Sequence, residues 1–128
     1  MQRKYNNGDW TAARFNSFVK SALRSASQRW PPRYKVLKKA AVGKKTNIKT
    51  GRLAEHYLCN SCKKEFPLKE VNVDHIIPVV PLSGFTTWDE VIHNMFCEED
   101  NLQILCKHCH TIKTNAEKRI AKENKYNE

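Results

Sequence analysis

Two Cys-x-x-Cys pairs constrain the fold of this chain more than any other feature of its sequence. The pairs, Cys59/Cys62 and Cys106/Cys109, are separated by 43 residues. Four thiolates in this paired spacing can complete the tetrahedral shell of a structural zinc ion. We therefore expect the chain to fold around a four-cysteine zinc site. The fifth cysteine, Cys97, is expected to be a small buried apolar side chain and not a ligand.

The length of 128 residues favours one domain with a modest core. Residues 1–10 carry no apolar stretch typical of a secretory signal. The longest mostly apolar run, residues 76–82, is far shorter than the roughly 20 residues needed to span a bilayer. We therefore expect a soluble, cytoplasmic protein with no membrane partner, in which reduced cysteines bind metal in preference to forming disulfides.

The formal net charge of +10 is unevenly distributed along the chain. Residues 1–56 hold 14 Lys and Arg against two acidic residues, whereas residues 57–128 hold nine against 11. A basic half on its own is equally consistent with a solvated, well-charged surface. Next to a metal-bound module, it instead favours a polyanionic partner, and we expect that partner to be nucleic acid.

Apolar side chains recur at three- and four-residue steps from Ala12 to Ala26 and predict an amphipathic helix, with Asp9 or Thr11 as its N-cap. The pair Pro31-Pro32 is expected to stop this segment and to open a second short helix over roughly residues 33–41. The start of the chain is therefore expected to be largely helical.

Residues 42–52 are polar, basic and bounded by glycines, which is typical of a linker or a mobile arm. Within this arm, Lys44, Lys45 and Arg52 are expected to contact phosphates. Together with the two helices, the arm completes an expected basic helical N-terminal extension over residues 1–56.

Residues 57–121 are expected to form a second module, followed by a frayed, flexible tail over residues 122–128. The expected elements are a strand over 71–76, a helix over 88–96 capped by Thr86 or Thr87, a return strand over 101–105 and a helix from Cys109 to about Ala121. His56, just before this module, is expected to be an accidental surface histidine. The expected fold class is α+β.

Three polar residues beside the cysteine pairs have no role in a four-cysteine zinc site: Asp74, His75 and His110. A carboxylate and two imidazoles near a zinc-bound scaffold suggest a second, reactive site. Adjacent residues of a regular strand face opposite ways, so Asp74 and His75 can converge only if the strand ends or twists there. Pro78, which disrupts ladder pairing, supports such an ending.

The order of these motifs resembles the HNH endonuclease family. The resemblance covers about residues 57–117 and rests on Cys-x-x-Cys, then Asp-His-Ile-x-Pro, then Asn-Leu-Gln-x-Leu-Cys-x-x-Cys-His-x-x-Lys-Thr. It implies a ββα-metal, treble-clef-like module that hydrolyses phosphodiester bonds of double-stranded DNA. The residues 1–56 have no counterpart in the bare motif and look similar to accessory DNA-binding extensions of small phage-type nucleases, so we expect a phage or a bacterial host cell as the setting.

The resemblance also implies roles for individual residues. His75 would be the general base, and Asp74 with His110 would hold a catalytic divalent ion, with Mg²⁺ or Mn²⁺ favoured by the carboxylate. Asn101 would orient the base or steady the loop between the strands. The competing asparagine, Asn94, is expected to expose its amide on a helix.

The sequence departs from the family pattern in two ways: residues 78–85 replace the Gly-Gly that often follows Asp-His-Ile, and the loop between the strands is long and carries an extra helix. One turn beyond His110, Lys113 is expected to meet a phosphate. Nicking and double-strand cleavage both remain open, because cutting two strands requires a homodimer or two successive events.

Two further interpretations stay open at this point. His110 could be a zinc ligand of a Cys₃His centre, although four paired cysteines already complete the shell. The whole chain could be a non-catalytic zinc-ribbon module that binds nucleic acid. The joint presence of Asp74, His75, Asn101 and His110 favours the enzyme, because a pure binding module needs none of them.

Overall fold

The computed structural model describes residues 3–126 of the chain. It groups the chain into two compact units, Met1–Trp30 and Pro31–Glu128. The division therefore falls earlier than the boundary after residue 56 that the charge distribution suggested. The second helix and the basic segment that follows it belong to the same unit as the cysteine pairs.

The first unit is built around the helix α1 (Ala12–Ser27), preceded by the 3₁₀ turn η1 (Asn6–Gly8). The expected N-cap is confirmed at Thr11, whose hydroxyl accepts a hydrogen bond from Arg14 N at 3.1 Å. The rings of Tyr5 and Phe15 lie 4.8 Å apart, and Tyr5 and Trp10 form a β-bridge. The segment before α1 is thus folded back onto the helix.

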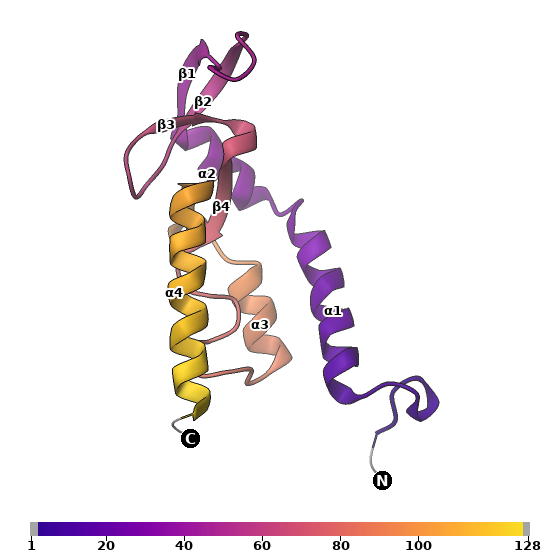
Figure 1. Cartoon of the computed structure of the whole chain (residues 1–128). Coiled ribbons are helices and arrows are strands. Elements are labelled where there is room, and N and C mark those ends of the chain that lie inside the picture. Colours follow the sequence, from indigo (N-terminus) through magenta and orange to yellow (C-terminus); the bar gives the residue numbers. More distant parts are fainter. Residues whose placement is uncertain (1–2, 127–128) are drawn as a thin grey trace. The chain divides into compact units, whose positions relative to one another are not determined.

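The second unit begins with α2 (Pro31–Ala40) and continues into a three-stranded antiparallel sheet, which consists of β1 (Ala41–Thr46), β2 (Leu53–Leu58) and β3 (Glu65–Pro67) in that order. The expectation that residues 42–52 are a linker was wrong. They form most of a β-hairpin, in which Lys44 pairs with Glu55 and Thr46 with Leu53 (Figure 1).

Burial of His56 is a second correction. Its side chain is only 7% exposed, and its Nδ1 lies 2.8 Å from Ala54 O. His56 lies on β2, the central strand of the three-stranded sheet, opposite Pro67 of β3. It is therefore a structural residue of the sheet.

The rest of the second unit is a two-stranded antiparallel sheet followed by a long helix (Figure 1). Its elements are η2 (Leu68–Glu70), β4 (Val71–His75), α3 (Trp88–Met95), η3 (Glu99–Asn101), β5 (Leu102–Cys106) and α4 (Lys107–Tyr126). Helix α4 contacts both β4 and β5. This β–β–helix order is the architecture expected from the sequence, and the mixed α+β fold class is confirmed.

The helix ends differ in part from expectation. Thr87 caps α3, with its hydroxyl accepting from Glu90 N at 3.2 Å, as predicted. Helix α4 begins at Lys107, before the second cysteine of its pair, and continues to Tyr126. Most of the expected frayed tail is therefore helical, and residues 127–128 lie outside the described part of the chain.

The core of the second unit centres on β5, of which every residue except Gln103 is buried. Leu105 clusters with Cys59 and Cys106, and Phe66 and Cys109 pack against this cluster. Val91 and Met95 of α3 are also fully buried. Among residues 3–126, no helix is long and apolar enough to cross a membrane.

Candidate zinc centre and catalytic site

Four cysteines from three separate segments meet at one point of the second unit. The Sγ atoms of Cys59, Cys62, Cys106 and Cys109 all lie within 4.8 Å of one another. A tetrahedral zinc ion with Zn–S bonds of about 2.3 Å holds its sulfurs about 3.8 Å apart, so small shifts would complete such a site. The cluster is therefore positioned to bind a metal such as zinc, as predicted.

Local backbone geometry shapes both cysteine turns. In the first turn, Lys63 adopts φ +62°, while Cys59 N donates to Lys64 O at 2.9 Å and Lys63 N donates to Cys59 O at 3.0 Å. In the second turn, at the start of α4, Cys109 N lies 3.4 Å from Cys106 Sγ and donates to it. Backbone N–H groups directed at sulfur stabilise the thiolate form that a metal requires.

The thiols of the cluster influence one another's ionisation. Burial by itself raises the pKa of Cys59, but hydrogen bonds from the backbone of Cys106 and of its own turn outweigh burial and lower the pKa to about 6. Hydrogen bonding with the Cys106 thiol, together with burial, raises the pKa of Cys109 to about 12. Cys59 therefore loses its proton more readily than Cys109.

Cys97 lies outside this cluster and is half-buried. Burial raises the pKa of its thiol, so it is a poor thiolate donor. The expectation that Cys97 is not a ligand agrees with this placement.

Asp74 is the centre of a second polar cluster on the face of β4 that meets α4. Its side chain is buried, and its two oxygens have different partners. Oδ2 accepts a hydrogen bond from Gln103 Nε2 at 2.9 Å and lies 3.3 Å from Lys113 Nζ. Oδ1 lies 3.6 Å from His110 Nε2. One oxygen is therefore held by the protein, while the other faces the imidazole of the helix.

Gln103 connects this carboxylate to the first cysteine turn. Its Oε1 accepts a hydrogen bond from Asn60 Nδ2 at 2.8 Å, and Asn60 N donates to Ile104 O at 2.8 Å. Asn60 lies between the cysteines of the first pair. The hydrogen bonds from Asn60 to Gln103 and from Gln103 to Asp74 therefore link that turn to the carboxylate. Sequence reasoning missed both residues, although aligning the two strands would have placed Gln103 directly opposite Asp74.

The ring of His75 is held by the end of α3. Its Nε2 lies 3.0 Å from Met95 O. Because a carbonyl oxygen can only accept a hydrogen bond, Nε2 carries the proton and the lone pair of the neutral ring is on Nδ1. His75 O accepts from Lys113 Nζ at 3.0 Å, so its backbone borders the Asp74 cluster. Asp74 thus contacts His110 and Lys113 of α4 directly, whereas the ring of His75 is oriented by Met95 at the end of α3.

Asn101 contacts the chain immediately after β4. Its Oδ1 accepts from Ile77 N at 2.8 Å, its Nδ2 donates to Ile77 O at 3.3 Å, and its backbone O accepts from Ile76 N at 2.9 Å. These contacts tie η3 to the loop that follows His75. Asn94, expected to expose its amide, is half-buried instead and donates from Nδ2 to Val79 O at 3.2 Å.

The four cations expected to bind phosphate occupy two places. Lys113 lies in the Asp74 cluster and also pairs with Glu117. Lys44, Lys45 and Arg52 lie on the β1–β2 hairpin, where Lys45 pairs with Glu65. All three hairpin residues are classed as exposed.

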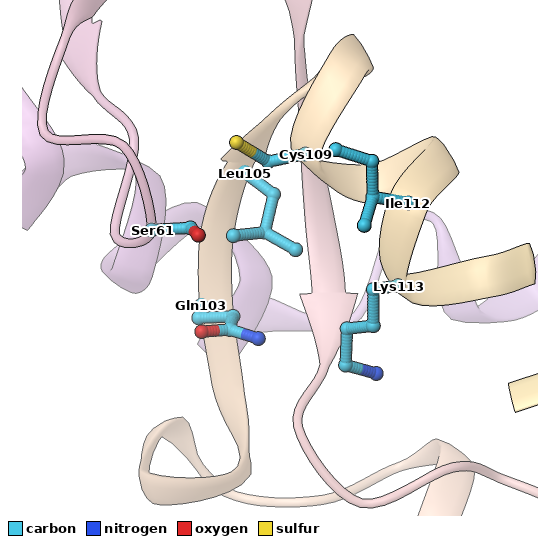
Figure 2. A pocket seen from close by; sticks show the side chains of 6 residues that line it. All are labelled: Ser61, Gln103, Leu105, Cys109, Ile112 and Lys113. Carbon is cyan, nitrogen blue, oxygen red and sulfur yellow. The ribbon is translucent and has the colours of Figure 1, made fainter. Parts of the chain in front are cut away.

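A cavity of about 390 Å³ opens between β5 and α4. It is lined by Ser61, Gln103, Leu105, Cys109, Ile112 and Lys113 (Figure 2). Cys109 lies at one end of it, and Gln103 and Lys113, the two partners of Asp74 Oδ2, lie at the other. The cysteine cluster and the Asp74 cluster therefore border the same open cavity.

A two-stranded antiparallel sheet, a helix packed on it and a four-cysteine cluster at their junction define a ββα module with a metal site. The family model described as HNH endonuclease matches residues 59–116 of the chain. The matched segment contains both cysteine pairs and the residues Asp74, His75, Asn101 and His110. No curated protein and no solved structure gave a significant match to the chain.

Proposed function

We propose that the protein is a metal-dependent endonuclease that hydrolyses phosphodiester bonds of double-stranded DNA. The observation that carries the proposal is the buried carboxylate of Asp74, with one oxygen 3.6 Å from His110 Nε2, inside the segment that matches the HNH endonuclease model. A buried carboxylate held toward an imidazole is the kind of donor pair that a divalent ion needs.

The residues present fit such an ion. Two ligand atoms bound at about 2.1 Å to one ion lie roughly 3–4 Å apart, and the distance between Asp74 Oδ1 and His110 Nε2 is in that range. When bound, Mg²⁺ or Mn²⁺ would neutralise phosphate charge and stabilise the leaving oxygen. The contribution of this chain is to hold Asp74 through Gln103 and Lys113, so that Oδ1 stays turned toward His110.

His75 is assigned the role of general base. The hydrogen bond from Nε2 to Met95 O fixes the tautomer with its lone pair on Nδ1, and the same carbonyl stabilises the ring after Nδ1 takes a proton from water. General-base catalysis is typically worth about 10²–10⁴-fold in rate. Asn101 is assigned the role of steadying the loop after His75 through Ile77.

The four-cysteine cluster is assigned a structural zinc ion. All four positions of a tetrahedral shell are supplied by the protein, which leaves no position for water or substrate. Zinc therefore links the first cysteine turn, β5 and α4. Strand β5 carries Gln103, and α4 carries His110 and Lys113, the partners of Asp74.

The test is cleavage of supercoiled plasmid by the zinc-loaded chain, with Mg²⁺, with Mn²⁺ or without added ion. The parent should cleave only with added ion, and His75→Ala should lose about 10²–10⁴-fold in rate. His108→Ala, at an exposed histidine of α4, is the matched control and should cleave like the parent.

The products separate the remaining possibilities. Nicked circles indicate single-strand cleavage, and linear product at the earliest times indicates a homodimer that cuts both strands. Parental cleavage by His75→Ala would remove His75 as the base. DNA binding without cleavage by the parent, under any of these ions, would favour the non-catalytic zinc-ribbon module.

A further inference from the structure

The β1–β2 hairpin, residues 41–58 and called the basic ribbon below, has a charge pattern that the nuclease chemistry does not explain. It contains Lys44, Lys45, Lys49 and Arg52 and a single acidic residue, Glu55. Glu55 is engaged locally, since its Oε1 accepts a hydrogen bond from Gly43 N at 2.7 Å. The ribbon is therefore a basic two-stranded element that does not belong to the HNH segment.

The tip of the ribbon has a defined structure. Asn47 N donates to Arg52 O at 2.8 Å, Gly51 N donates to Asn47 O at 2.7 Å, and Asn47 Oδ1 accepts from Lys49 N at 3.0 Å. Gly51 has φ +73°, a conformation that favours glycine. A loop closed by these bonds holds the residue between them, Ile48, in one place.

Ile48 is the most exposed large apolar side chain of the described residues, at 97%, and Leu53 next to the tip is 71% exposed. A single exposed apolar side chain is ordinary on a protein surface. This one, however, stands at the end of a hydrogen-bonded loop among cations, where a lysine or serine would serve solubility better. Its position is that of a contact residue.

The cations of the ribbon divide into two groups. Lys45 pairs with Glu65 and Lys49 with Glu70, which anchors the ribbon to the rest of its unit. Lys44 and Arg52 are exposed and form no ion pair within residues 3–126. Lys44 lies on β1 opposite Glu55, whereas Arg52 directly precedes β2 and its carbonyl accepts the hydrogen bond from Asn47 N, so one of these cations lies on each arm of the hairpin.

We propose that the basic ribbon enters the major groove of duplex DNA, with Ile48 against apolar base edges and with Lys44 and Arg52 on phosphates of the two flanking strands. The major groove, about 12 Å wide, admits a two-stranded ribbon, and one cation on each arm of the hairpin suits the two phosphate walls. This inference rests on the proposed function, because it takes the cleaved DNA as the ligand.

The experiment measures binding of zinc-loaded full-length His75→Ala, which leaves the probe intact, to a short mixed-sequence DNA duplex by fluorescence anisotropy across a salt series. Adding Lys44→Ala with Arg52→Ala should reduce the slope of log affinity against log salt by roughly 2, because each phosphate contact contributes about 0.9. Adding Ile48→Ala should weaken binding about tenfold, equivalent to about 1.4 kcal/mol, and leave the slope unchanged.

Matched controls separate the ribbon from general surface effects. Lys118→Ala with Lys122→Ala removes two exposed charges from α4, and Ile120→Ala truncates an isoleucine of α4 that is 42% exposed. Binding should be nearly unchanged by either control. Circular dichroism and zinc content confirm that each variant is folded.

Duplex RNA of the same sequence tests the groove itself. Its deep, narrow major groove excludes a ribbon, so RNA should bind more weakly and Ile48→Ala should not alter that binding. An Ile48→Ala variant that binds DNA like its parent, or one that loses affinity equally for RNA, overturns the ribbon inference while leaving the nuclease intact. Absence of DNA binding by the parent overturns both.

Discussion

Gln103→Ala is the most informative single change in the candidate site, because it alters the support of the metal ligand without touching either proposed ligand. Gln103 Nε2 donates to Asp74 Oδ2 at 2.9 Å, and once the amide is removed Lys113 is the one partner left to that oxygen among residues 3–126. The carboxylate can then rotate, and its Oδ1 is no longer fixed toward His110. The substitution leaves the four cysteines unchanged, so the zinc content of the protein should stay the same.

The size of the effect follows from the type of bond. A hydrogen bond to a charged group contributes about 1.5–3 kcal/mol, and loss of a residue that orients a metal ligand typically costs 10–100-fold in affinity or activity. We therefore expect the Mn²⁺ concentration for half-maximal plasmid cleavage to rise by about 10–100-fold. Cleavage at saturating Mn²⁺ should fall less, because the ligands themselves are unchanged.

Two matched variants sharpen this test. Asn60→Ala removes the hydrogen bond that positions Gln103, together with the exposed bond from Lys63 Nζ to Asn60 Oδ1, and should produce a smaller rise in the required Mn²⁺ concentration. Asn115→Ala, at an exposed position of α4, should produce none. A purely structural role of Gln103 would lower melting temperature without changing the ion requirement. Parental ion dependence in a folded, zinc-loaded Gln103→Ala protein would refute the reasoning.

Three further changes test other parts of the structure. Cys59→Ser should release zinc and unfold the second unit in a circular-dichroism melt, because metal binding to such sites contributes on the order of 10 kcal/mol to folding, whereas Cys97→Ser should retain the metal. Asn101→Ala, which loses both side-chain bonds to Ile77, should slow plasmid cleavage by roughly tenfold with unchanged DNA binding, and equal rates would argue against a role in the loop. Thr11→Ala should destabilise α1 by about 1 kcal/mol, seen as lost helical signal on warming, and an unchanged melt would show that the cap is dispensable.

Elements with strong local signals were predicted well from the sequence. Helices α1 and α3 combine apolar periodicity with a threonine cap, and both caps, Thr11 and Thr87, lie where the pattern placed them. Strand β4 shows the alternation and β-branching from which it was predicted. The cysteine cluster was predictable because spacing alone restricts which metal geometry four thiolates can adopt.

The β1–β2 hairpin was missed because its local signals resemble those of a linker. Strand β1 is exposed at all but its first residue, so no apolar alternation marks it. Lysines and glycines dominate the segment, and its register depends on backbone bonds around Asn47. His56 was misjudged for the same reason, since its burial depends on the strands on either side.

Some contacts of the candidate site have no signature in the sequence. His75 is oriented by the carbonyl of Met95, and every residue has a carbonyl. Asn94 was misjudged because its partner is the backbone of Val79, in a long irregular loop. Side-chain chemistry identified the candidate residues, whereas the groups that hold them in place are largely backbone.

Strand β5 carries Gln103 and Cys106 three positions apart, so one short stretch of peptide serves both the Asp74 cluster and the cysteine cluster. Inserting a single residue between them would turn Gln103 to the opposite side of the sheet, because side chains alternate along a strand. A register that keeps Cys106 in the cysteine cluster would then turn Gln103 away from Asp74, and one that keeps Gln103 next to Asp74 would displace Cys106. We therefore expect the stretch of β5 from Gln103 to Cys106 to tolerate no change in length.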